Sequence, residues 1–352
     1  MCELTHSFNN KITKIFLGEK LPKKLAVAVS GGVDSLALTI LLGEFCLQEN
    51  IELFALTVDH KMRESSSKEA LALSKVLGKN KISHHILEID QKKLPQRNIE
   101  SSLREIRYEL LGDFCKKQKI SHLFLGHQLG DVAENFLIRL FRGSGLDGLS
   151  TIAEILEVNK IKLVRPLLDF DKSDLENFLR AKKIKWFEDE SNLDEKFLRN
   201  KIRNFFATFD EKNLIQKRIK NATDEIAKMR DFFDEIMLKE AKKILKFHDK
   251  KYFLINHKKL QKLDEKFALK ILALVAMEIS QKNYKPRLKD LKKFYEYLLK
   301  NKIIKPRNFY GCEISQYDAN YLILRSQEPK KIDKNLNDEF YFRTVLGKIF
   351  TN

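Results

Sequence analysis

The sequence predicts an α/β fold with a doubly wound, mostly parallel sheet, followed by a basic, mainly helical domain that ends in a β-hairpin. Two observations lead to this prediction: strands and helices alternate from residue 25 to residue 126, and both composition and charge change near residue 210. The chain has 352 residues, which exceeds the roughly 250 to 300 at which a single hydrophobic core stops growing. We therefore expect two or more domains.

Short, continuous apolar runs are the expected strands of the sheet. They lie at 25–29, 53–58, 85–89 and 122–126. Segments with helical periodicity separate them, at 33–48, 66–79 and 100–118. Continuous apolar strands that alternate with helices indicate a parallel sheet with both faces covered. A further helix is expected at 128–142.

Long, lysine-rich amphipathic stretches replace this alternation after about residue 205. They occupy 211–247, 257–282 and 286–301. Such stretches with almost no glycine are typical of a helical domain that follows a helical linker. Residues 308–326 alternate as a hairpin does, with Asp318 to Asn320 as its turn. We predict three parts: an α/β domain at 1–205, a helical linker at 206–247, and a basic helical domain with a short β tail at 248–352.

The formal net charge of +17 is concentrated in the second part of the chain. Residues 1–210 carry 33 Lys and Arg against 30 Asp and Glu, whereas residues 211–352 carry 33 against 19. An excess of cations on one part favours a polyanionic partner such as a nucleic acid. The alternative is that lysine, which supplies 27 of those 33 cations, serves solubility alone.

Composition and cysteine content exclude several classes of protein. Apolar residues make up 43% and charged residues 33% of the chain, which excludes a disordered chain. The longest apolar stretch, Phe267 to Met277, is too short to cross a bilayer, and the N-terminus lacks the features of a secretion signal. We expect a cytoplasmic protein with no membrane partner. The cysteines have no metal-ligand spacing and are expected to be reduced and structural; they are Cys2, Cys46, Cys115 and Cys312.

The strongest signal for a binding site is the run Ser30-Gly31-Gly32-Val33-Asp34-Ser35, between the first strand and its helix. Two glycines let the backbone approach an oxyanion, and N–H groups at a helix N-terminus point at it. The run therefore predicts a phosphate site at the carboxyl end of a strand, and a plain glycine turn is the alternative. It is not a Walker A loop, because no lysine follows a glycine at the required place. The GxGxxG match at 143–148 follows a helix, so we reject it as a dinucleotide fingerprint.

This loop resembles the pyrophosphatase loop of the N-type ATP pyrophosphatase (PP-loop) superfamily. Further motifs are Val58-Asp59-His60 with Met62-Arg63, Arg104 with Arg107-Tyr108, RGSG at 142–145 with Gly148-Leu149, Arg165-Pro166-Leu167-Leu168, Trp186 to Asn192, and Arg199-Asn200 with Arg203. Together with the loop, they resemble the tRNA(Ile)-lysidine synthetase family of this superfamily. The resemblance covers about residues 23–205, and beyond them only the plan of a linker and a basic helical domain matches. It implies an N-type ATP pyrophosphatase catalytic domain at 1–205 and a tRNA-binding domain at 248–352.

The resemblance implies an ATP-dependent carbon–nitrogen ligase. Members of the family join lysine to C2 of the wobble cytidine of a CAU-anticodon tRNA(Ile), through an adenylated tRNA, with release of pyrophosphate and AMP. The implied cofactors are ATP and Mg²⁺, and the implied partners are this tRNA and L-lysine. A second copy of the chain, in a homodimer, is a further candidate partner. The alternatives are another PP-loop tRNA-modifying enzyme, or a non-catalytic RNA-binding protein with a nucleotide site.

Each expected role falls on particular residues. The catalytic set is Asp34, His127 and Arg107, in which Asp34 is also the Mg²⁺ ligand and His127 is the candidate base, because its ordinary pKa lies near working pH. The ATP-binding set is Ser30, Gly31, Gly32, Val33, Asp34, Ser35, Asp59 and His60.

The substrate-binding sets complete the prediction. Asp131, Glu134 and Arg107 are assigned to lysine, since His127, Asp131 and Glu134 share one helix face at spacings of four and three. The alternative is a solvated polar stripe. The tRNA-binding set is Arg142, Arg199, Asn200 and Arg203, for which ordinary surface charge is the alternative.

Two positions depart from the family pattern. Gly130 stands where the family usually has the first of two adjacent aspartates, and the run Asp189-Glu190-Ser191-Asn192 lacks the usual proline. We expect activity to persist through Asp131.

Overall fold

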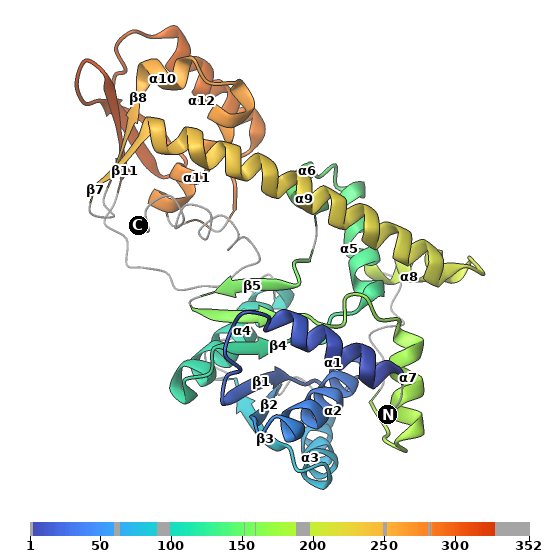
Figure 1. The fold of residues 1–352 in the computed structure, drawn as a ribbon. Coiled ribbons are helices and arrows are strands. Elements are labelled where there is room, and N and C mark those ends of the chain that lie inside the picture. The colour runs from blue at the N-terminus through green and yellow to red at the C-terminus, as the bar shows by residue number, and fades with distance from the viewer. Residues whose placement is uncertain are drawn as a thin grey trace. The chain divides into compact units, whose positions relative to one another are not determined.

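The computed structural model describes residues 3–59, 64–89, 99–150, 152–158, 160–187, 198–248, 252–280, 282 and 284–327. The chain divides into two compact units, residues 1–230 and 231–352 (Figure 1). Within the described ranges, no helix is long and apolar enough to span a membrane. Cys2, His60, Met62, Arg63 and the run from Asp189 to Asn192, which the sequence analysis names, lie outside the described residues.

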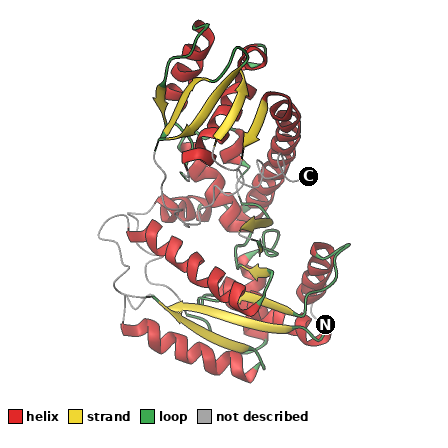
Figure 2. Cartoon of the chain, turned by 90° about the vertical axis from the view of Figure 1, so that its left-hand side faces the viewer, coloured by secondary structure: helices red, strands yellow, loops and turns green. Residues whose placement is uncertain are grey.

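The first unit is built on a six-stranded sheet with the order β3-β2-β1-β4-β6-β5. Its elements are α1 (Glu3–Ile15), β1 (Lys24–Ala28), α2 (Val33–Gln48), β2 (Glu52–Asp59), α3 (Glu64–Lys79), β3 (Ser83–Glu88), α4 (Ile99–Gln118), β4 (His122–Phe124), α5 (Leu129–Phe141), α6 (Leu146–Leu149), β5 (Ile155–Val158), β6 (Ile161–Val164), α7 (Lys172–Ala181) and α8 (Leu198–Ala207). Neighbouring strands are parallel except β5, which is antiparallel to β6. Helices cover both faces of these strands (Figure 2). The predicted doubly wound, mostly parallel sheet is confirmed.

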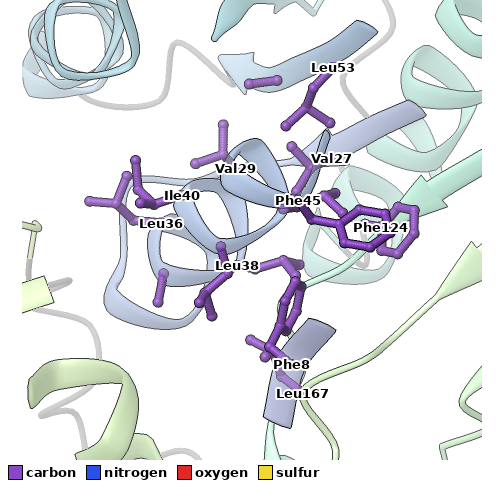
Figure 3. Packing of buried hydrophobic residues seen from close by; sticks show 14 of the residues in the cluster. Phe8, Val27, Val29, Leu36, Leu38, Ile40, Phe45, Leu53, Phe124 and Leu167 are labelled. Atoms are coloured by element: carbon purple, nitrogen blue, oxygen red, sulfur yellow. The ribbon is translucent and has the colours of Figure 1, made fainter. Parts of the chain in front are cut away.

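Helix α2 occupies the centre of the core of this unit. Its side chains Leu36, Leu38 and Phe45 are buried together with Phe8 of α1 and Phe124 of β4 (Figure 3). Because α2 is apolar on almost every side, it is suited to a fully buried position. Its first turn, and with it the predicted phosphate loop, is thereby fixed at the carboxyl end of β1.

The hairpin of β5 and β6 was not identified from the sequence. Each strand has only four residues, which is too short to give a clear periodic signal. Glu157 of β5 lies opposite Lys162 of β6 in the register. The pair extends the sheet beyond β4.

The second unit contains a five-stranded antiparallel sheet with the order β7-β8-β11-β10-β9. Its elements are β7 (Leu245–His248), β8 (Tyr252–Asn256), α10 (His257–Gln261), α11 (Glu265–Ser280), α12 (Leu288–Lys300), β9 (Arg307–Phe309), β10 (Cys312–Gln316) and β11 (Tyr321–Ser326). The core lies between α11, α12 and the sheet.

The predicted terminal hairpin corresponds to β10 and β11. In its turn, Asp318 Oδ1 accepts hydrogen bonds from the backbone N–H groups of Asn320 at 2.7 Å and Tyr321 at 2.8 Å. The sheet is larger than the predicted short tail, because β7 and β8 precede the helices and pair with it. Strand β7 follows α9 directly in a lysine-rich stretch, so no change in the sequence pattern marks where the helix ends and the strand begins.

Helix α9 (Lys212–Ile244) begins in the first unit and ends in the second. Its first part is tied to the first unit: Lys217 Nζ lies 3.1 Å from Asp171 Oδ2, and Arg230 Nη1 donates to Ser150 Oγ at 2.6 Å. Most of the expected linker at 206–247 is therefore helical. The functional boundaries at 205 and 247 stay predictions.

Candidate active site

The predicted phosphate loop connects the end of β1 to the start of α2. Gly31 has a φ of +86°, a conformation that favours glycine. Gly32 is the N-cap residue of α2 and has no side chain to cover the helix end. Ser35 closes the loop, since its Oγ accepts from the Ser30 N–H at 3.1 Å and donates to the Gly32 carbonyl at 3.1 Å. The first-turn N–H groups of α2 can therefore bind an anion.

Two glycines permit close packing around this loop. A Cβ atom on Gly31 would lie 2.7 Å from the ring of Phe187, whose backbone N–H donates to the Gly31 carbonyl at 3.0 Å. A Cβ atom on Gly126, just after β4, would lie 2.8 Å from Cα and 2.9 Å from N of Ser35. The end of β4 thus packs on the first turn of α2. This is where the strand order reverses, the usual ligand position in an open α/β sheet.

Asp34 places a carboxylate beside the loop. Its Oδ1 atom is buried and has no hydrogen-bond partner among the described residues. Burial, followed by the charge of Asp131, raises the pKa of Asp34 to about 7, while Lys172 and Arg203 oppose this shift. A carboxyl group perturbed in this way next to an anion seat is typical of a functional site.

Helix α5 brings two more carboxylates to the same region. Asp131 Oδ2 accepts from the Gln128 N–H at 3.1 Å and so caps the helix. Glu134 is 5% exposed, and both of its oxygens are engaged by α8: Arg199 Nε donates to Oε2 at 2.9 Å and Arg203 Nε donates to Oε1 at 2.7 Å. Burial raises the pKa of Glu134 despite these arginines. One buried carboxylate therefore holds two partly exposed guanidinium groups.

His127 lies between β4 and α5, and its Nδ1 atom is buried with no hydrogen-bond partner in the described part of the chain. Burial lowers the pKa of His127 to about 4; Asp131 opposes this shift, and Arg165 and Arg104 add to it. His127 is expected to act as the base because the ordinary pKa of histidine, about 6.5, lies near working pH, and this reason does not hold in the folded protein. The ring is therefore neutral at neutral pH.

Two arginines of α4 flank a buried tyrosine near this histidine. The guanidinium carbons of Arg104 and Arg107 lie 5.4 and 5.5 Å from the centre of the Tyr108 ring. Tyr108 is 9% exposed, and its hydroxyl has no hydrogen-bond partner among the described residues. The charges of Arg104 and Arg107 both lower the pKa of His127, so α4 contributes positive charge to the region.

Comparisons with known proteins agree with this arrangement. A family model described as a PP-loop domain matches residues 4–208. The tRNA(Ile)-lysidine synthase of Wolbachia pipientis wMel is 34% identical to this chain, over 92% of this chain and 77% of that protein. The chain belongs to the tRNA(Ile)-lysidine synthase family. The tRNA(Ile)-lysidine synthase of Rickettsia typhi is 31% identical, over 89% of this chain and 71% of that protein.

A solved structure shows the same fold. The U34-tRNA thiolase NcsA from Methanococcus maripaludis matches with a TM-score of 0.54 and 21% identity, over 64% of this chain and 80% of that chain. At this identity, the likeness concerns the fold alone.

The site residues predicted for this lysidine synthase family member fall into two groups. Asp34 interacts electrostatically with Asp131, Glu134 and Arg203, and His127 interacts with Asp131. Arg107 joins them through His127, and Arg199 through Glu134.

Of three other predicted residues, two are buried and one lies at the far end of α5. Asp59 ends β2 and is 5% exposed, and Asn200 of α8 is 6% exposed. Arg142 is exposed at the C-cap of α5, about 17 Å along the helix from Asp131. The predicted roles of all these residues stay predictions.

At position 130, where the resemblance led us to expect an aspartate, the structure shows how the space beside Gly130 is filled. Gly130 is buried in the first turn of α5, and a Cβ atom there would lie 2.9 Å from the Gln128 side chain. Gln128 folds over this position, and its Oε1 accepts from the Gly130 N–H at 2.5 Å. The amide side chain thus takes the space and caps the helix.

Lys172 is a site residue that the sequence analysis missed. It is the first residue of α7, directly after the N-cap residue Asp171, and its charge lowers the pKa of Asp34. A single lysine at the start of a helix carries no periodic signal. Its position after the Arg165-Pro166-Leu167-Leu168 motif was the available clue.

Proposed function

We propose that this chain is an ATP-dependent carbon–nitrogen ligase that joins L-lysine to C2 of the wobble cytidine of CAU-anticodon tRNA(Ile), which yields lysidine. The observation that carries the proposal is the convergence of the phosphate loop and a buried acidic cluster where β1 and β4 meet. The loop suits the phosphates of ATP, and the cluster suits a cationic amino acid. The name shared by the relatives along most of the chain supports the same reaction.

In the first step, the C2 oxygen of the cytidine attacks the α-phosphorus of ATP, and the bond to pyrophosphate breaks. Negative charge grows on the phosphate oxygens during this step. The N–H groups at the start of α2 are placed to stabilise that charge. Arg107 and Lys172 add positive charge nearby.

Asp34 fits the role of Mg²⁺ ligand. Its Oδ1 is a buried carboxylate oxygen without a hydrogen-bond partner among the described residues, and hard cations prefer oxygen ligands. The described residues contain no group of three or more His, Cys, Asp and Glu that could hold a metal ion, so in this proposal Asp34 is the one side chain of the described part of the chain that would hold the ion. The ion, when bound, neutralises phosphate charge.

In the second step, the lysine ε-amine attacks C2, the bond to AMP breaks and the attacking nitrogen loses a proton. The neutral His127 offers Nδ1 as an acceptor for that proton. Asp131, Glu134 and Arg107 are the proposed lysine contacts. Glu134 can take part while bound to Arg199 and Arg203, because each carboxylate oxygen accepts more than one hydrogen bond.

Cations on both units are proposed to bind the tRNA. Arg199 and Arg203 have side chains that are 43% and 37% exposed, so phosphates can reach them, and the exposed Arg142 extends this set. Asn200, the other residue predicted to bind tRNA, is 6% exposed and is not one of these surface groups. The excess of cations in residues 211–352 supports a wider contact with the RNA backbone. A homodimer and a cytoplasmic location stay predictions.

The reaction can be tested with the full-length protein, ATP, radiolabelled lysine and an unmodified tRNA(Ile) transcript with a CAU anticodon. We expect lysine incorporation with equal amounts of AMP and pyrophosphate, and none with a transcript whose wobble cytidine is replaced by uridine. Release of pyrophosphate without lysine incorporation would indicate another tRNA modification. Binding of tRNA without release of pyrophosphate would indicate a non-catalytic RNA-binding protein.

A further inference from the structure

A chain of hydrogen bonds reaches the phosphate loop from the part of the sheet formed by β2 and β3. It begins at Ser74 of α3, whose Oγ lies 2.6 Å from Nδ1 of His84 on β3. The Nε2 atom of His84 lies 2.8 Å from Oγ1 of Thr57 on β2. Thr57 Oγ1 donates to the carbonyl of Val29 at 2.8 Å. These residues have no assigned role in the site described above.

The bond to Val29 has a fixed direction, because a carbonyl oxygen only accepts, whereas the directions of the two bonds to His84 depend on its tautomer. Burial, and then the charge of His85, lowers the pKa of His84 to about 4, so at neutral pH one ring nitrogen donates and the other accepts. Thr57 gives its single hydroxyl proton to the Val29 carbonyl, and it accepts from His84 in the tautomer that carries the proton on Nε2. In that tautomer Nδ1 accepts from Ser74, whose hydroxyl proton is shared with the Ala70 carbonyl at 3.1 Å.

The last link fixes the peptide that leads into the loop. The Val29 carbonyl and the Ser30 N–H belong to one peptide plane. Thr57 holds its carbonyl end, and Ser35 Oγ holds its N–H end at 3.1 Å. Gly31 and Gly32 follow directly and have no side chains of their own to fix them. The orientation of the Val29–Ser30 peptide therefore determines where the loop begins.

We propose that His84 is a positioning residue for ATP: it orients Thr57, and through it the Val29–Ser30 peptide, so that the loop presents its N–H groups to the triphosphate. The proposal rests on the proposed function, because it takes ATP as the ligand of this loop. Preorganised donors bind an anion better than donors that must first be ordered. His84 itself does not touch the nucleotide.

Two substitutions separate positioning from packing. In His84→Gln, the side-chain amide can place an N–H where Nε2–H lies, whereas the amide of His84→Asn reaches only the position of Nδ1. We expect His84→Asn to raise the KM and the Kd for ATP by about 5-fold to 30-fold, the range for loss of one buried hydrogen bond. We expect His84→Gln to stay within about 3-fold of the wild type, and the KM values for lysine and tRNA to stay unchanged in both variants.

A second pair tests the next link. Thr57→Val keeps the branched shape but loses the hydroxyl, and should behave as His84→Asn does. Thr57→Ser keeps the hydroxyl and should behave as the wild type. His85→Asn is the matched control, because His85 lies on the same strand against Phe54 and Phe114, and it should leave ATP binding unchanged.

The readouts are steady-state KM values, direct ATP binding by calorimetry, and the melting temperature of each full-length variant. Unchanged ATP affinity in His84→Asn, or an equal loss in His84→Asn and His84→Gln, would overturn the proposal. A uniform rise in the KM of all three substrates would also overturn it. If the wild type forms no lysidine, the proposed function fails, but the calorimetric ATP affinities still test the role of His84.

Discussion

The two units of this chain use charge in different ways. In the first, Asp34 and Glu134 are carboxylates whose pKa values are raised by burial, and arginines approach within hydrogen-bonding distance of Glu134. In the second, exposed lysines such as Lys289 and Lys293 lie along α12. Charges removed from water interact strongly with a substrate, whereas solvated charges hold a polyanion by releasing its counterions. A charge that acts in the reaction therefore benefits from burial, whereas a charge that binds a polyanion benefits from exposure to solvent.

The largest expected effect comes from the buried carboxylate of the first unit. Asp34→Asn keeps the shape of the side chain and removes the charge proposed to hold Mg²⁺. We expect tRNA-dependent pyrophosphate release to fall by about 100-fold or more, while tRNA binding in a filter assay stays within about 2-fold. Pyrophosphate release near the wild-type rate would remove Asp34 from the proposed mechanism.

Glu134→Gln tests whether the buried acidic face recognises lysine. Loss of one partner from a buried, hydrogen-bonded charge pair costs about 2 to 5 kcal/mol, so we expect the KM for lysine to rise by at least about 30-fold. Steady-state kinetics with lysine and tRNA varied separately measure this effect. If the rise is confined to tRNA, Glu134 serves only to hold Arg199 and Arg203.

The exposed charges of the second unit should affect affinity rather than chemistry. A variant with glutamine in place of Lys289, Lys292, Lys293 and Lys300 should bind tRNA several-fold more weakly, with a shallower dependence on salt, since about one counterion is released per phosphate contact. The rate at saturating tRNA should not change. Binding measured at several salt concentrations checks this.

The matched control for this variant replaces exposed lysines near the amino-terminal ends of strands in the first sheet, which lie opposite the end that carries the proposed site. Lys79, Lys81, Lys116 and Lys119 lie near the beginnings of β3 and β4, whereas the proposed site lies at the carboxyl ends of the strands. Replacing these four by glutamine should alter tRNA binding less. An equal loss in the two variants would mean that total charge, and not its location on the second unit, determines affinity.

The smallest expected effect comes from Asp169, a half-exposed carboxylate of the first unit. It tests whether the large effects expected for Asp34 and Glu134 depend on their burial or only on their place in the first unit. Asp169 pairs with Lys11 at 2.7 Å and with Lys220 at 3.2 Å, but its side chain is 46% exposed. Burial alone would raise its pKa, yet the hydrogen bond from Lys11 and the nearby positive charge lower it overall. Asp169→Asn should reduce the free energy of unfolding at pH 7 by at most about 1 kcal/mol.

The pH dependence of this difference follows from the lowered pKa. The folded protein binds the proton of Asp169 less readily than the unfolded chain, so the stabilisation is present above the unfolded pKa of about 3.9 and is lost as pH falls through the folded value. Denaturant unfolding at pH 7 and at low pH should show the difference between wild type and variant shrinking with acidity. A difference that grows with acidity would contradict this interpretation.

Local patterns were sufficient to predict the loop at 30–35 and the place of Asp131 and Glu134 on α5. The expected position of His127 on the same helix face is wrong, because α5 begins at Leu129, after the N-cap residue Gln128. The run at 30–35 lies between a strand and a helix as expected, and the spacing of Asp131 and Glu134 does bring both toward Asp34. The pairing of Glu134 with Arg199 and Arg203 could not be predicted, because these residues are 65 and 69 positions apart in the sequence. Tertiary packing of α8 on α5 creates it.

The pKa of His127 could not be predicted for a similar reason. Its depression depends on burial and on arginines contributed by α4 and by the segment after β6. Strand β7 was hidden because it continues a lysine-rich helix without a turn residue. In each case the deciding contact or boundary is set by tertiary structure, which a local pattern does not contain.

The contact between Gly126 and the first turn of α2 has a consequence for how this sequence can change over time. A methyl group at position 126 would meet backbone atoms of Ser35 and Asp34, and no change of a neighbouring side chain can make room for it. At Gly78 and Gly145, by contrast, an added Cβ atom would have nothing within 4 Å. We expect substitutions to be tolerated at those two glycines. At Gly126, even alanine would require strand β4 and helix α2 to move apart, and this would separate the two sides of the site.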